Sequence, residues 1–186
     1  MSVDVVRRLF TVEEYRHMAE AGILTANDRV ELIEGEVLEM TPIGSRHAAC
    51  VAGLAQLLSV RVQDRARVWP QNPVKISVYS EPQPDVALLR PRAVPYRDAG
   101  PTAADVLLII EVADRSLTRD RRVKIPLYAM AGIPEVWIVD LEGGSVEVYT
   151  APTPTNYSSV SQYRRGESVC PSAFPDLHLS VDEIFA

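Results

Sequence analysis

Two short segments of this chain are apolar at every position, Val86–Leu89 and Val106–Ile110. A strand with one face in water alternates apolar and polar residues, whereas an uninterrupted apolar run is typical of a strand buried on both faces. Such strands need cover on both sides of their sheet. Because helical patterns occur before and after them, the chain is predicted to form an α/β sandwich with a mixed central β-sheet flanked by helices.

Three helices are predicted from caps and periodicity. Residues 11–21 begin with the capping-box pattern of Thr11 and Glu14. A second helix runs from His47 to about Arg65, with small and branched apolar residues at helical spacing. A third covers about 119–131. Pro126 falls inside it, and an interior proline removes a hydrogen bond, so this helix is expected to start late or to kink there.

The strands are predicted from apolar runs and turn signals. Arg29–Ile33 and Glu36–Met40 flank Glu34-Gly35 and form a hairpin. Further strands are expected at Arg67–Trp69, Val74–Val78, Asp85–Leu89, Val106–Ala113, Glu135–Asp140 and Ser145–Thr150. Residues 90–102 are expected to be a loop, and 151–175 a loop with an edge strand. A short final helix is expected after a cap at Ser180.

The size and composition favour one domain over residues 1–186. The chain has 186 residues, 47% apolar and 24% charged, which is ordinary for a soluble globular protein. It has no apolar run near the roughly 18 residues that cross a bilayer, and its first fifteen residues lack the apolar segment of a signal peptide. Cys50 and Cys170 have no metal-ligand spacing. We therefore expect a cytoplasmic protein with reduced thiols and no membrane contact.

The charge of the chain limits how it can meet a nucleic acid. A formal net charge of −6 argues against a broad, non-specific coat on DNA, which requires a basic surface. A local basic patch remains possible, because four arginines lie within eight residues: Arg115, Arg119, Arg121 and Arg122. The same cluster is equally compatible with a solvated helix face that carries charge pairs.

Acids stand at the ends of the two apolar runs. Asp85 precedes the first and Glu111 follows the second. An acid at the end of a buried strand loses hydration and needs a partner, usually a cation. Of the nineteen basic residues only two are Lys, Lys75 and Lys124. A compact ammonium group can lie among carboxylates where arginine does not replace it. The rarity of lysine therefore favours a specific role for Lys124, which follows shortly after Glu111. Two acids and a lysine in this order are the components of a metal site for phosphodiester hydrolysis.

These residues belong to a longer pattern: Glu31–Glu36, His47, Pro84-Asp85, Glu111–Ser116, Asp120 and Lys124–Asp140. The pattern resembles the Uma-type family of bacterial proteins, which are restriction-endonuclease-like members of the PD-(D/E)XK nuclease superfamily. The resemblance runs from about Thr11 to Thr150, and its most specific part is the block from Lys124 to Asp140.

The resemblance implies a restriction-endonuclease-like core that binds Mg²⁺ (or Mn²⁺). Asp85 then corresponds to the PD aspartate and Glu111 to the (D/E) position, and the backbone carbonyl of Val112 is a further ligand. The motif lysine would fall at residue 113, which is Ala113. The catalytic lysine is therefore expected to be displaced to Lys124, which requires the following helix to turn this side chain back towards Glu111.

Two further residues are candidate accessory groups. Glu31 and Glu34, near the first hairpin, are both possible additional acids at the metal, and Glu31 matches the resemblance better. His47 can act at the metal or phosphate, but a lone histidine at the start of a helix is more often a polar cap or a packing residue.

Each of the main site residues also has an alternative structural role. Asp85 can cap a strand, Glu111 can pair with an arginine, and Lys124 can form a solvated pair with Asp120 at i,i+4 spacing. Tyr128 and Trp137 are interpreted as core aromatic residues rather than platforms for bases.

Two functions from different classes remain. One is a Mg²⁺-dependent endonuclease that hydrolyses phosphodiester bonds of DNA, expected to act as a homodimer because two cuts on a duplex need two sites. The other is a non-catalytic, dimeric binding or assembly protein that keeps the nuclease fold. The acidic net charge favours the second, and the retention of Asp85, Glu111 and Lys124 favours the first.

Overall fold

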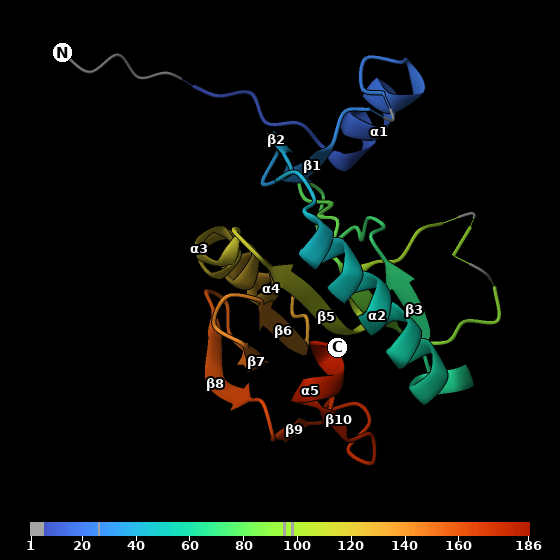
Figure 1. Cartoon of the computed structure of the whole chain (residues 1–186). Coiled ribbons are helices and arrows are strands. Elements are labelled where there is room, and N and C mark those ends of the chain that lie inside the picture. Colours follow the sequence, from blue (N-terminus) through green and yellow to red (C-terminus); the bar gives the residue numbers. More distant parts are fainter. Residues whose placement is uncertain (1–5, 26, 95, 98) are drawn as a thin grey trace.

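A six-stranded mixed sheet forms the centre of the molecule. The computed structural model describes residues 6–25, 27–94, 96–97 and 99–186. The strand order is β3-β4-β5-β6-β7-β8, and only β5 and β6 run parallel to each other (Figure 1). The strands are β3 Arg67–Pro70, β4 Val86–Leu89, β5 Val106–Ala113, β6 Glu135–Asp140, β7 Ser145–Pro152 and β8 Tyr157–Arg164. The predicted mixed sheet is confirmed.

Both faces of this sheet are buried at its central strands, as the apolar runs predicted. Successive side chains of a strand point to opposite faces. Val86 and Leu88 therefore join one apolar cluster while Ala87 and Leu89 join another. All four residues of β4 are fully buried. Helices flank the sheet on both sides, which confirms the predicted sandwich.

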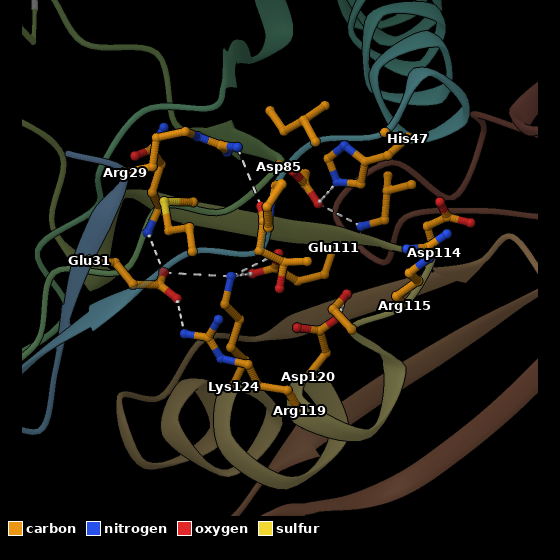
Figure 2. A pocket seen from close by; sticks show the side chains of 18 residues that line it. Arg29, Glu31, His47, Asp85, Glu111, Asp114, Arg115, Arg119, Asp120 and Lys124 are labelled. Atoms are coloured by element: carbon orange, nitrogen blue, oxygen red, sulfur yellow. Dashed lines mark hydrogen bonds and ion pairs between the residues drawn. The ribbon is translucent and has the colours of Figure 1, made fainter. Parts of the chain in front are cut away.

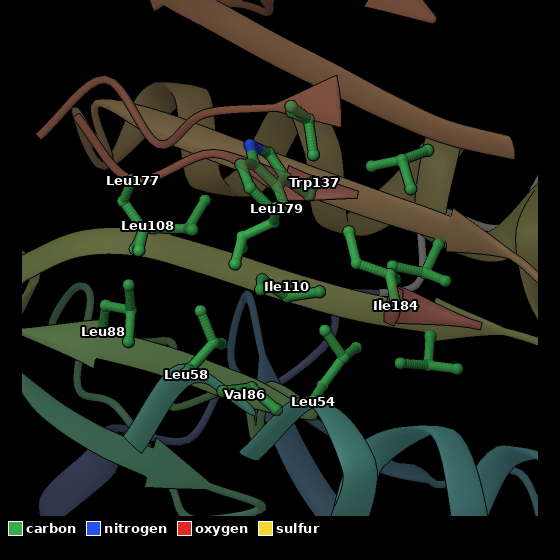
Figure 3. Close-up of a cluster of buried hydrophobic side chains, with 14 of the residues drawn as sticks. Leu54, Leu58, Val86, Leu88, Leu108, Ile110, Trp137, Leu177, Leu179 and Ile184 are labelled. Carbon is green, nitrogen blue, oxygen red and sulfur yellow. The ribbon is translucent and has the colours of Figure 1, made fainter. Parts of the chain in front are cut away.

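Helix α2, Ser45–Val62, covers one face of the sheet. Leu54 and Leu58 of this helix pack in the same cluster as Val86 and Ile110 (Figure 3). A 3₁₀ turn, Gln63–Arg65, completes the predicted helix. Beyond the same face lie the short pair β9 (Ser168–Val169) and β10 (Leu179–Ser180) and the helix α5 (Val181–Ile184), whose capping box at Ser180 was predicted.

The opposite face is covered by a helical segment of three parts. These are α3 Leu117–Arg119, a π-helical segment Asp120–Lys124 and α4 Ile125–Met130. Ile125 and Tyr128 belong to the apolar cluster on this face. The segment ends where Gly132 adopts φ +72°, a left-handed conformation that favours glycine and had been predicted as the stop.

The N-terminal elements form a small unit above the sheet (Figure 1). Helix α1, Val12–Glu20, begins with the predicted capping box of Thr11 and Glu14. Strands β1 (Val30–Ile33) and β2 (Glu36–Glu39) form the predicted hairpin. Its turn residues Glu34 and Gly35 have φ of 49° and 81°, the two positive values that a type I′ turn requires.

One predicted strand is wrong. Residues 74–78 form no strand, and the isolated bridge that involves them joins Lys75 to Thr102. The backbone folds back on itself instead, because Val74 N–H donates to Pro82 O and Ile76 N–H donates to Ser80 O. Val74 and Ile76 are nonetheless buried, so the alternation that indicated a strand reflects a turn with one inward face.

The remaining connections agree with the predictions where the structure describes them. Residues 90–102 contain no strand or helix in their described part, whereas 95 and 98, like 1–5 at the N-terminus, lie outside the described residues. Cys50 and Cys170 are free thiols. Among the described helices, none combines the length and the apolar character needed to cross a bilayer.

Candidate active site

Asp85 lies where β4 begins, immediately after Pro84. Its Oδ2 atom accepts two hydrogen bonds, from the backbone N–H of Val112 (2.8 Å) and from Nε2 of His47 (3.0 Å). The first bond crosses from β4 to the end of β5, so the expected role of Asp85 as a strand cap is present in the structure. The second fixes the carboxylate from the direction of α2 (Figure 2).

Pro84 leaves the carbonyl of Val112 without its ladder donor. The register of β4 with β5 ends at the pair of Val86 and Ile110, and a continued ladder would place residue 84 opposite Val112. The bond from Val112 N–H to Asp85 shows that the polar groups of Val112 face this side. An amide at residue 84 would donate to the Val112 carbonyl, but proline has no N–H. A backbone oxygen beside Asp85 is thereby free of the sheet.

Glu111 occupies the third position from the end of β5 and is deeply buried. Both of its oxygens lie 3.1 Å from Nζ of Lys124, and Oε1 also accepts a 2.5 Å hydrogen bond from the hydroxyl of Tyr128. Burial raises the pKa of Glu111, and the attraction of Lys124 opposes this shift. The surrounding carboxylates raise the pKa of Lys124 despite its burial. The lysine therefore stays protonated at neutral pH.

A π-helical turn brings Lys124 back to Glu111. The N–H of Ile125 donates to the carbonyl of Asp120, five residues earlier instead of four. Such turns occur mostly as single bulges within α-helices and often at functional sites. Pro126 then falls in the first turn of α4, where a missing N–H is tolerated. This arrangement fulfils the geometric condition that the displaced lysine required, and it explains why Pro126 does not break the helix.

Glu31 reaches the same cluster from β1. It is 2% exposed. Its Oε1 accepts from Nη2 of Arg119 (2.9 Å), and its Oε2 accepts from the backbone N–H of Gln83 (3.2 Å) and lies 3.6 Å from Nζ of Lys124. Glu34 is instead exposed in the hairpin turn. Of the two acids considered from the sequence, only Glu31 is brought to the site.

His47, in the first turn of α2, supports Asp85. Its hydrogen bond to Asp85 raises the pKa of the imidazole, with desolvation acting in the opposite direction. The other ring nitrogen, Nδ1, is buried, and within the described part of the chain it has no hydrogen-bond partner. The interpretation of His47 as only a polar helix cap is wrong, because α2 has no side-chain cap and the ring bonds Asp85.

Two of the structural alternatives for the charged residues are also wrong. Lys124 is buried and contacts Glu111 and Glu31, so it is not half of a solvated pair with Asp120. Glu111 pairs with this lysine rather than with an arginine. Asp120 is itself buried and accepts a 2.6 Å hydrogen bond from the hydroxyl of Ser116.

The sequence analysis missed two residues of the site. Tyr128 is a core aromatic, as expected, yet its hydroxyl donates to Glu111. Arg119 belongs to the predicted basic cluster, but it is committed to Glu31. The signal for Tyr128 was its i+4 spacing from Lys124, which places both side chains on one helical face.

These side chains line one pocket of about 330 Å³. Five carboxylates face four cationic side chains in its lining: Glu31, Asp85, Glu111, Asp114 and Asp120 against Arg29, Arg115, Arg119 and Lys124. The wall next to α2 is apolar and consists of Met40, Pro42 and Ile43. Figure 2 shows the carboxylates of Asp85 and Glu111 close together at the centre of the cluster.

The donor atoms fit a hard divalent cation held by few protein ligands. Within the described residues, no three His, Cys, Asp or Glu side chains form a group that could hold a metal by themselves. Mg²⁺ does not need such a group, since it keeps several waters and binds through one or two carboxylates plus substrate phosphate. Asp85, Glu111 and the backbone carbonyl of Val112 would be oxygen ligands of this kind.

The fold and the pocket define a class of protein. A mixed sheet with a Pro-Asp start on one strand, a glutamate near the end of its neighbour and a buried lysine against that glutamate is the arrangement of restriction-endonuclease-like nucleases. The chain belongs to the Uma2 family, described as "Putative restriction endonuclease", whose model matches residues 12–182. The resemblance found in the sequence is thus confirmed.

A solved structure shows the same fold. It is the crystal structure of a protein from Anabaena variabilis, described as "a putative nuclease belonging to DUF820". The two proteins are 19% identical, the match covers 95% of this chain and 97% of that chain, and the TM-score is 0.72. A search of the curated proteins found no match.

Proposed function

We propose that this protein is a metal-dependent endonuclease that hydrolyses phosphodiester bonds of DNA. The observation that carries the proposal is the convergence of Asp85, Glu111 and Lys124, from three separate elements, on one pocket. Asp85, Glu111 and the Val112 carbonyl would hold Mg²⁺ or Mn²⁺. When bound, the metal lowers the pKa of a coordinated water and neutralises charge that develops on the phosphate.

The protein's own groups would orient and stabilise the reacting atoms. Lys124 lies among carboxylates that raise its pKa, so it would act as a charged hydrogen-bond donor to the attacking water or to the charge that develops on the phosphate. Tyr128 holds one oxygen of Glu111, and His47 holds one oxygen of Asp85. These contacts keep both carboxylates in place before substrate arrives. Glu31 would hold Lys124 from the other side.

The active assembly is proposed to be a homodimer. A duplex requires one cut in each strand, and two-fold symmetry supplies two sites in opposite directions.

The first test is metal binding, because it needs no knowledge of the DNA sequence that is cut. Calorimetric titration with Mn²⁺ should show a saturable site in the wild type that is lost in Asp85→Asn. Asp176→Asn is the matched control, since Asp176 is exposed, pairs with Arg65 and does not line the pocket. Cleavage of plasmid and single-stranded DNA should require Mn²⁺ or Mg²⁺ and should be lost in the same variant. Equal binding and cleavage by Asp85→Asn would refute the assignment, and no metal binding at all would favour a non-catalytic binding protein.

A second prediction concerns Pro84. An alanine at this position has an N–H that could donate to the Val112 carbonyl and extend the ladder between β4 and β5, which ends at Val86 and Ile110, by one bond. That bond competes with the metal for the carbonyl oxygen. Because altering groups around metal ligands typically costs 10–100-fold in affinity, Pro84→Ala should weaken Mn²⁺ binding by about tenfold or more.

Pro70→Ala is the control for this experiment. Pro70 lies on edge strand β3, and because Gln71 N–H donates to Asp85 O, the neighbouring Pro70 faces away from β4. Its added N–H points to solvent and leaves the site unchanged. Calorimetry on both variants would contradict the role of Pro84 if they bound Mn²⁺ equally well.

A further inference from the structure

Two of the four cationic side chains in the pocket have no acidic partner among the residues that the structure describes. Arg119 is bonded to Glu31, and Lys124 lies between Glu111 and Glu31. Arg29 donates only to a backbone oxygen, that of Thr41, at 3.3 Å. For Arg115 no hydrogen bond or ion pair occurs with any residue that the structure describes. Arg29 and Arg115 are both exposed.

The two arginines lie on different sides of the acidic pair. Arg29 directly precedes β1 and stands next to the loop that contains Thr41. Arg115 follows the end of β5 by two residues. Figure 2 shows Arg29 on one side of Asp85 and Glu111 and Arg115 on the other side, and both line the pocket. An extended chain that crosses Asp85 and Glu111 would therefore pass both guanidinium groups.

The balance of charges in the pocket decides which cationic side chains can bind phosphate. The buried carboxylates already pair with Arg119 and Lys124, so the charges of these two cations are compensated within the pocket before a polyanion arrives. The whole chain is also acidic, with a net charge of −6. A nucleic acid therefore needs local cations that are free to bind phosphate. Guanidinium groups suit that role, because their planar donors match the phosphate oxygens in a bidentate geometry.

We propose that Arg29 and Arg115 bind the backbone phosphates on either side of the phosphodiester at Asp85 and Glu111. This inference rests on the proposed function, and it specifies that the site recognises the charged backbone of a nucleic acid strand. Contacts with phosphate position a strand but read no base, so binding at this site is independent of base sequence.

The test is the salt dependence of nucleic-acid binding, measured without catalytic metal. Fluorescence anisotropy would follow a labelled 30-base-pair DNA duplex and one of its single strands in EDTA, over a series of salt concentrations. Each lost phosphate contact reduces the slope of log K against log salt by about 0.9 for a duplex or about 0.7 for a single strand. Arg29→Gln and Arg115→Gln should each show such a reduction, and the double variant should show about twice that reduction.

Arg122→Gln is the matched control. Arg122 belongs to the same arginine cluster, is exposed and, among the described residues, has no ion-pair partner, but it does not line the pocket. Its slope should equal that of the wild type. Slopes that stay unchanged in Arg29→Gln and Arg115→Gln, or that fall equally in all three variants, would overturn the inference. Much weaker binding of the wild type to a second labelled duplex of unrelated sequence would also overturn the inference.

Cleavage separates this inference from the proposed function. If the wild type cuts DNA but the slopes of the two pocket variants are unchanged, the proposed function stands and the phosphate contacts are wrong. If the slopes fall as expected but no divalent metal supports cutting, the two arginines bind phosphate and the protein is a binding module. A wild type that binds neither probe overturns both proposals.

Discussion

Replacing Lys124 with methionine should lower the free energy of unfolding by about 3–5 kcal/mol, the usual cost of removing one partner of a buried ion pair. Methionine retains most of the volume, so the loss is electrostatic. The ammonium lies 3.1 Å from both oxygens of Glu111 and 3.6 Å from Glu31. Without it, two buried carboxylates remain with less compensation. Urea unfolding followed by circular dichroism measures the effect.

The loss of stability in Lys124→Met should depend on pH. Burial already places the pKa of Glu111 above its usual 4.5, and removing the lysine removes an attraction that lowers it. When folding raises the pKa of an acid, the protonated acid contributes to the free energy of unfolding. This contribution is complete at a pH below the pKa in the unfolded state and is lost as the pH rises through the pKa in the folded state. The loss in free energy of unfolding, relative to the wild type, should therefore be smaller at pH 5 than at pH 8.

A second substitution distinguishes charge from packing. Glu111→Gln in the Lys124→Met background replaces the ionisable group by a neutral one of similar shape and should restore part of the lost stability. It should also flatten the pH dependence between 5 and 8. Neither variant should cleave DNA under the proposed function. If Lys124→Met were as stable as the wild type at pH 8, the lysine would not be held in this buried cluster.

Much of the fold could be predicted, because local patterns and global burial agree in the central strands. The apolar runs of β4 and β5 indicated strands covered on both faces, and the structure covers both. The capping boxes at Thr11 and Ser180 fixed two helix starts. The predicted strand at 74–78 failed because alternation reports which side is buried. It does not report whether the backbone bonds to a neighbouring strand or to itself.

The site was predictable in its residue types but not in its connections. Asp85, Glu111 and Lys124, the residues selected from the sequence, line one pocket. The π-helical turn that brings Lys124 to Glu111 was not visible, since its residues have the same apolar spacing as an α-helix. The partners of Glu31 were not visible either. They come from Arg119 and the backbone of Gln83, distant segments whose approach depends on the tertiary packing.

Replacing Trp137 with alanine should lower the free energy of unfolding by about 3–5 kcal/mol, the range measured for large aromatic residues in cores. Trp137 is fully buried in β6 and belongs to the cluster that joins the sheet to α2 and α5 (Figure 3). Its indole N–H also donates to Glu135 at 2.6 Å, and Glu135 in turn accepts from the backbone N–H of Ser172. The alanine variant therefore loses packing and leaves one oxygen of a buried carboxylate without its donor.

Trp137→Phe separates these two losses. It keeps most of the ring but not the N–H, so it should cost clearly less than alanine. Urea unfolding with an unchanged slope would assign the difference to the folded state. Because Trp137 pairs with Ile110, the residue before Glu111, the same core holds the strand that carries the site. Mn²⁺ titration of the folded variants should still show the site, since no pocket residue is altered. A cost below about 1 kcal/mol for alanine would contradict this core, because such a cost is typical of a surface substitution.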